Sequence, residues 1–172
     1  MILGLSTANF TLLHVVISLV AIASGLVVVL GMLQSQRMPG WTLLFLVMTI
    51  LTSVTGFLFP IHGFTPALGL GTISLLLLLV TVIALYAKHL DGRWRWIYVV
   101  TALVALYLNV AVLIIQSFQK LSVLNPAAQV VGPPFAGDVN THFMIAQAVV
   151  LLLFLVFGTL AALKFRPAPS LS

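Results

Sequence analysis

Three of the four histidines are placed where an imidazole could bind a metal ion or haem. His14 lies near the start of an apolar run, His62 lies in the short segment between two runs, and His142 opens a later run. Imidazole nitrogens are ligands for zinc, copper and haem iron. Because Asp138 and Met144 flank His142, the sequence predicts a candidate site for haem or for a copper or zinc ion.

The spacing of these histidines does not select a ligand set. No two of them lie three or four residues apart, as a pair on one helix face would. On a helix, His142 projects about 140° away from Gln147, so both cannot face the interior. The alternative is that the histidines are amphipathic residues at a membrane boundary, which is what we expect for His89 beside Lys88.

A second set of candidates forms a polar stripe along one predicted helix, within about 100° of arc. Its members are Tyr98, Thr101, Ala105, Asn109, Gln116 and Lys120. Asn109 falls near the middle of its apolar run, where an unpaired amide is costly. We expect it to pair with a hydroxyl of residues 42–59 or with Gln147. The stripe is therefore either a set of hydrogen bonds between helices or the wall of a polar path or ligand pocket.

Side-chain patterns typical of enzymes are missing from the sequence. It contains no HExxH, no GxSxG and no phosphate-binding P-loop. Its only carboxylates besides the C-terminus are Asp91 and Asp138, which fall on opposite sides of the predicted membrane and cannot form a catalytic pair. The absence of cysteine excludes thiolate chemistry. The sequence favours a non-enzymatic role and leaves a histidine-dependent membrane enzyme open.

The elements that must position these side chains are five long apolar runs. The chain is 62% hydrophobic and 5% charged, whereas soluble domains are about 25% charged. A helix needs about 20 apolar residues to span a bilayer, so we predict an all-α domain of five transmembrane helices over residues 1–172. The helices cover residues 10–33, 42–59, 67–87, 96–119 and 142–164, with a long loop over 120–141.

Small residues recur at helical spacing in the first three runs, where they predict faces on which helices pack closely in lipid. The stripes comprise His14, Ser18, Ala21 and Gly25; Thr49, Thr52, Ser53 and Gly56; and Ala67, Gly71, Ser74 and Thr81.

The basic residues are distributed unevenly over the connections. Five spans place six of them on one side, and these are Arg37, Lys88, Arg93, Arg95, Lys164 and Arg166. The opposite side has only Lys120. The positive-inside rule then places the N-terminus and loop 120–141 outside and the C-terminus inside, with all three tryptophans at the inner interface. The same basic residues are too scattered to bind nucleic acid.

Three segments resemble small bacterial polytopic membrane proteins that have no assigned activity. They are residues 56–66 (GFLFPIHGFTP), 94–102 (WRWIYVVTA) and 105–110 (ALYLNV). The resemblance covers most of the second to fourth predicted helices. It implies a location in a bacterial plasma membrane, the inner membrane, and implies nothing about chemistry.

These observations leave three functions open. The leading interpretation is a non-enzymatic bundle that acts as an accessory or ligand-binding subunit of a larger membrane assembly, with other membrane subunits or a second copy as partners. The first alternative is a haem- or metal-binding redox component that uses the outer histidines. The second is a small transporter or channel walled by the polar stripe and Gln147.

The predicted orientation can be tested by cysteine labelling, because the natural chain has no cysteine. We expect Gly132→Cys to react with an impermeant thiol reagent in intact cells, and Gly92→Cys to react only after the cells are permeabilised. Labelling in the reverse pattern would contradict the orientation.

Overall fold

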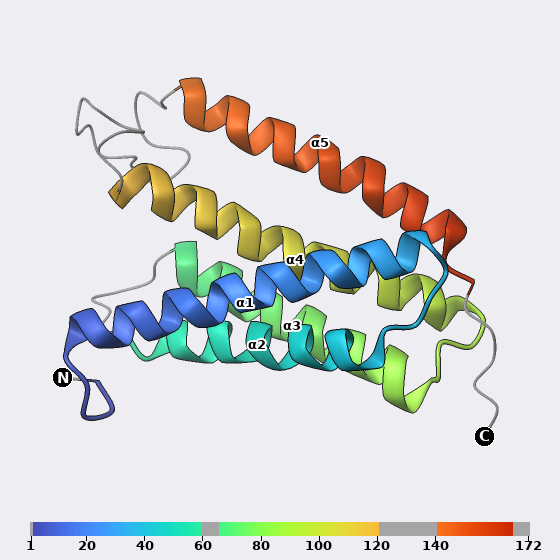
Figure 1. The fold of residues 1–172 in the computed structure, drawn as a ribbon, viewed down its shortest axis with the longest axis horizontal. Coiled ribbons are helices and arrows are strands. Elements are labelled where there is room, and N and C mark those ends of the chain that lie inside the picture. The colour runs from blue at the N-terminus through green and yellow to red at the C-terminus, as the bar shows by residue number, and fades with distance from the viewer. Residues whose placement is uncertain (1, 60–65, 121–140, 167–172) are drawn as a thin grey trace.

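Five long helices form the described part of the chain, which in this computed structural model comprises residues 2–59, 66–120 and 141–166 (Figure 1). The helices are α1 (Thr7–Leu33), α2 (Pro39–Phe57), α3 (Pro66–Val82), α4 (Arg93–Lys120) and α5 (Thr141–Lys164), and α3 continues into a π-helical turn, η1 (Ile83–Ala87). Each of the five, with η1 counted in the third, is long and apolar enough to cross a membrane. The prediction of an all-α, five-helix membrane protein is confirmed.

The helix ends differ from the predicted ones because polar and proline residues extend the apolar runs. α1 begins at Thr7 instead of residue 10, since the Ser6 side chain caps it by accepting a hydrogen bond from the Asn9 backbone N–H at 3.2 Å. α2 begins at Pro39, a residue whose missing N–H is tolerated in a first turn. α4 begins at Arg93, three residues before the predicted start.

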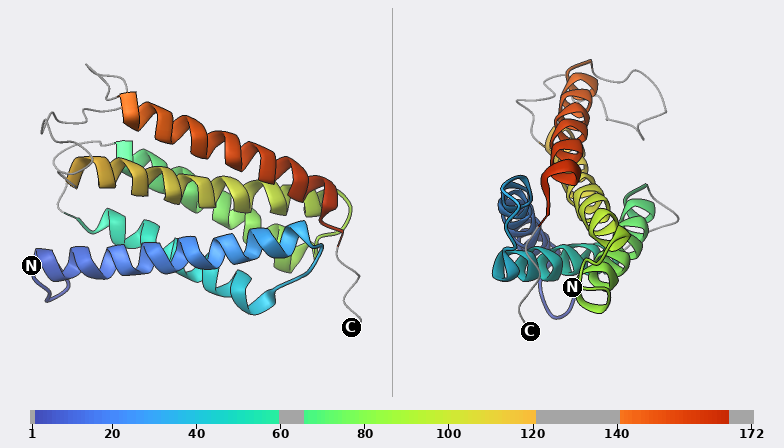
Figure 2. Two further views of the ribbon diagram at one scale, coloured as in Figure 1. Left: turned by 45° about the horizontal axis from the view of Figure 1, so that its top comes forward. Right: turned by 90° about the vertical axis from the view of Figure 1, so that its right-hand side faces the viewer.

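The helices are arranged as two antiparallel pairs with a fifth helix at one side. α1 packs along α2, and α3 packs along α4. α5 lies on α4, and it meets α1 only where both helices end; from there it diverges toward its own N-terminus (Figure 1, Figure 2). The hydrophobic core therefore lies mainly among α1 to α4 and takes in the C-terminal part of α5, whereas most of the remaining α5 surface is exposed.

Each of the three predicted small-residue stripes contributes buried residues to the described part of the bundle, among them Ala21, Thr49 and Thr81. Ala21 and Thr49 are fully buried. Gly25 lies where α1 meets both α2 and α4: a Cβ atom there would lie 2.6 Å from Leu106 Cδ1 and 2.9 Å from Phe45 Cδ2. Close approach at this point requires glycine, because both neighbouring side chains are themselves 1% exposed and have little room to move.

A matched pair of glycine substitutions tests this contact. Gly25→Ala should lower the free energy of unfolding by about 1–3 kcal/mol relative to Gly158→Ala, because overpacking forces buried neighbours to shift. At Gly158 the added methyl meets only Leu103 Cδ1 at 3.6 Å, an ordinary contact. Both variants gain the same helix propensity, so their difference in reversible unfolding in detergent reports the contact. Equal stabilities would show that α1 does not depend on a close approach here.

Candidate functional site

The six basic residues that the sequence analysis assigned to one side of the membrane lie at one end of the bundle. α1, η1 and α5 end there, and α2 and α4 begin there (Figure 1). Two short connections, residues 34–38 and 88–92, lie at this end together with residues 165–166 that follow α5. We call it the basic end, since it carries all six basic residues assigned to one side in the sequence.

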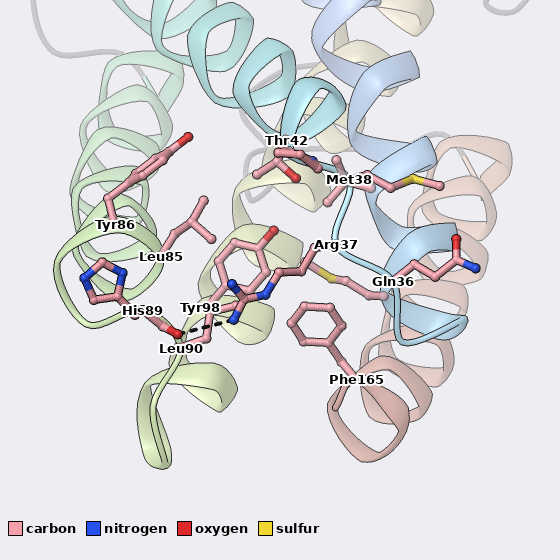
Figure 3. A pocket seen from close by; sticks show the side chains of 13 residues that line it. Gln36, Arg37, Met38, Thr42, Leu85, Tyr86, His89, Leu90, Tyr98 and Phe165 are labelled. Atoms are coloured by element: carbon pink, nitrogen blue, oxygen red, sulfur yellow. Dashed lines mark hydrogen bonds between the residues drawn. The ribbon is translucent and has the colours of Figure 1, made fainter. Parts of the chain in front are cut away.

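A cavity of about 220 Å³ lies at the basic end, between the two connections. Its lining comes from α1, α2, η1, α4, both connections and Phe165 after α5 (Figure 3). Most lining side chains are apolar, among them Met32, Leu85 and Leu90. Small-molecule sites are typically concave and apolar with a few convergent polar groups, so the polar groups decide what this cavity can do.

Three of the six hydrogen-bonding side chains that line the cavity are Arg37 of the 34–38 connection, Thr42 of α2 and Tyr98 of α4. Tyr98 is only 3% exposed, and its hydroxyl points toward Thr42, which is 5% exposed (Figure 3). Arg37 crosses the cavity, and its Nη2 donates to the His89 carbonyl oxygen at 3.4 Å (Figure 3). The Phe165 ring packs on the Tyr98 ring, with centroids 5.8 Å apart. Hydroxyl groups from two helices and the guanidinium of a connection thus line one cavity.

The backbone around the cavity adopts conformations that non-glycine residues rarely take. Ser35 has φ +57° in the turn that ends α1, where the Gln36 N–H donates to the Gly31 carbonyl at 2.9 Å. His89 and Leu90, just after η1, have φ +49° and +66°. Left-handed non-glycine residues and π-helical turns are both costly and concentrate at functional sites. The sequence did not predict these left-handed turns, because Ser35, His89 and Leu90 stand at positions where glycine would have indicated them.

Side-chain contacts hold the segments of the basic end together. The Arg166 backbone N–H donates to Ser35 Oγ at 2.7 Å, which joins the end of α5 to the α1–α2 connection. Lys88 Nζ lies 5.5 Å from the centroid of the Trp94 ring, a cation–π contact across the other connection. These contacts join the 34–38 connection to the segment after α5, and the 88–92 connection to α4.

Beyond Tyr98, the polar stripe of α4 makes hydrogen bonds between helices. Thr81 Oγ1 of α3 donates to Thr101 Oγ1 at 2.8 Å. Asn109 Nδ2 donates to Thr49 Oγ1 of α2 at 3.4 Å. The expected pairing of Asn109 with a hydroxyl of residues 42–59 is therefore confirmed.

The two glutamines among the predicted site residues lie apart from the cavity. Gln147 of α5 does not pair with Asn109; its Nε2 donates instead to the Ala111 carbonyl oxygen at 3.1 Å and so joins α5 to α4. Gln116, near the other end of α4, is half-buried. Of the predicted polar wall, only Tyr98 lines the cavity.

His14 belongs to the interface between α1 and α2. Its Nδ1 lies 2.7 Å from Thr55 Oγ1, and its ring meets the Phe59 ring edge-on at a centroid distance of 5.5 Å. Thr55 Oγ1 also donates to the Leu51 carbonyl at 2.6 Å. Thr55 Oγ1 is thus shared between the His14 ring and its own helix backbone. This contact fixes the ring within the helix pair.

The other predicted metal ligands are not brought to His14 in the described part of the chain. His142 is exposed at the start of α5, at the end where α5 diverges from α1 (Figure 2). His62 lies outside the described residues. Within the described ranges, no three His, Asp or Glu side chains group as metal ligands.

The chain matches no protein-family model, no curated protein and no solved structure. The resemblance in residues 56–66, 94–102 and 105–110 therefore stays a prediction.

A double-mutant cycle tests the central hydrogen bond. Asn109→Leu and Thr49→Val should each lower the free energy of unfolding, with a coupling of about 0.6 kcal/mol, because hydrogen bonds between membrane helices contribute little on average. The measurement is reversible unfolding of the single and double variants in the same detergent. Strictly additive effects would show that the two side chains do not interact.

Proposed function

We propose that this protein is a non-enzymatic, ligand-binding membrane subunit whose site is the cavity at the basic end. The observation that carries the proposal is the convergence of Arg37, Thr42 and Tyr98 on a cavity with otherwise mostly apolar walls. This combination is typical of small-molecule sites. Following the resemblance and the positive-inside rule, we propose a bacterial inner membrane with the basic end facing the cytoplasm.

The position of the cavity supports a role in which binding changes the arrangement of helices. A ligand there would contact side chains of α1, α2, η1 and α4 together with Phe165, which follows α5. It would therefore stabilise one relative placement of those helix ends over others. A ligand shifts such an equilibrium only by its difference in affinity for the two arrangements, and a site built from so many elements maximises that difference.

The remaining polar residues of α4 support packing in this proposal. Thr101 and Asn109 are engaged with Thr81 and Thr49 on neighbouring helices. Groups that satisfy one another in this way stabilise the bundle and leave the chemistry of recognition to the basic end.

A cavity-filling substitution with a matched control tests the site. We expect the natural protein to retain a small molecule through purification; Leu85 lines the cavity, so Leu85→Trp should fill it and abolish that retention. Leu79, on the same membrane-spanning segment, is 57% exposed, so Leu79→Trp should retain the ligand. The measurement is native mass spectrometry of the intact protein, followed by identification of the released molecule.

The unfolding midpoints of the two tryptophan variants provide the folding control and should agree within a few degrees in the absence of ligand. Ligand retention by a folded Leu85→Trp variant would contradict the proposal, as would a natural protein that carries and binds nothing.

A further inference from the structure

We infer that the ligand of this cavity carries a phosphate group, which the Arg37 guanidinium binds together with the Tyr98 and Thr42 hydroxyls. This inference rests on the proposed function and specifies the chemical class of its ligand.

The charge of the cavity favours an anion. Arg37 is the one lining residue with a permanent charge. Asp91, the acidic residue of the adjoining connection, is exposed and does not line the cavity. The surrounding basic end adds further positive charge, and a cleft lined by one sign of charge between low-dielectric walls concentrates ions of the opposite sign.

The Arg37 guanidinium makes one long hydrogen bond across the cavity, which involves only one of its nitrogen atoms. Its guanidinium has five N–H donors in a planar fork suited to phosphate oxygens. Its contact across the cavity is a 3.4 Å bond to the neutral carbonyl of His89. Bonds from guanidinium to an ionised oxygen are shorter and about twice as strong as neutral ones. An entering phosphate would therefore replace the His89 carbonyl as the better partner.

The two hydroxyls supply donors on the opposite side of the same space. Tyr98 and Thr42 come from α4 and α2 and point toward one another (Figure 3). Both are almost fully buried, and because their hydroxyls face one another, the pair keeps at most one proton free to donate to a ligand oxygen. Arg37, which is exposed, would supply the charged donors to a phosphate, and the hydroxyl pair would add a neutral one.

The size of the cavity limits what accompanies the phosphate. A volume of about 220 Å³ corresponds to roughly seven water molecules at about 30 Å³ each. The cavity can enclose a phosphate with a short polar carbon chain, such as glycerol phosphate, and because it is partly open, the rest of a larger ligand can lie outside it. The same chemistry has two sources: a soluble phosphate monoester, or the phosphodiester headgroup of a lipid whose chains stay in the bilayer.

The test measures two probes on the full-length protein. Glycerol phosphate is titrated at constant ionic strength, and lipid retention is measured by native mass spectrometry after exchange into equimolar phosphatidylglycerol and phosphatidylcholine. Arg37→Gln is compared with Arg93→Gln, which removes an exposed charge at the same end that does not line the cavity.

We expect the natural protein and Arg93→Gln to bind one of these probes alike. Arg37→Gln should weaken that binding at least about tenfold, the size expected for losing a charged hydrogen bond. Tyr98→Phe, which removes only a hydroxyl, should weaken it less, and Arg37→Lys should retain part of it. Binding of glycerol phosphate identifies a soluble ligand, whereas selective retention of phosphatidylglycerol identifies a lipid headgroup.

Equal binding by Arg37→Gln and Arg93→Gln would overturn the inference, and so would the absence of binding by both probes. The two proposals fail distinguishably. If Leu85→Trp removes the co-purified molecule and Arg37→Gln retains it, the proposed function holds and the phosphate inference fails; if a folded Leu85→Trp variant retains the molecule, the proposed function itself fails.

Discussion

The contact of Gly25 with Phe45 and Leu106 fixes how the first helix meets the rest of the bundle. In a bilayer, lipid chains are as apolar as leucine, so helices gain little from burying apolar surface against one another. Close van der Waals packing must supply that energy, and it acts only where small residues allow backbones to approach. One glycine on α1 admits side chains from both α2 and α4, so it sets the relative position of three helices.

This packing has a consequence at the basic end. Once α1 to α4 are fixed side by side, the connections 34–38 and 88–92 must reverse the chain within five residues each. They do so through left-handed residues, Ser35 in one and His89 and Leu90 in the other. Two tight turns between closely packed helices do not fill the space beneath them, and the cavity with Tyr98 at its base lies there. The strained backbone is tolerated because Arg37 and Arg166 tie these connections to other segments.

The sequence predicts those features that depend on residues close together along the chain. Runs of about 20 apolar residues identify all five helices, and the 100° spacing places Asn109 on the face where Thr49 meets it. The cavity was not predictable in this way. Ser35 and Arg166 are 131 residues apart, and no local pattern indicates that they meet. The left-handed turns lacked their usual signal as well, since His89 and Leu90 stand where glycine or asparagine is typical.

The distribution of polar residues follows from what each side chain can satisfy within its own helix. A threonine or serine hydroxyl can donate to the carbonyl one turn earlier, as Ser24 does to Val20 and Thr52 does to Met48. Such residues can be buried at mid-membrane without a partner on another helix, and there they add packing and little else. A guanidinium cannot be satisfied in this way, because its donors far outnumber the acceptors within reach along one helix. Charged recognition is therefore confined to the helix ends, where connections offer free carbonyls and water completes the remaining bonds. In this bundle, that constraint places Arg37 at the cavity and makes the basic end, instead of the polar stripe along α4, the place where the protein can select a ligand.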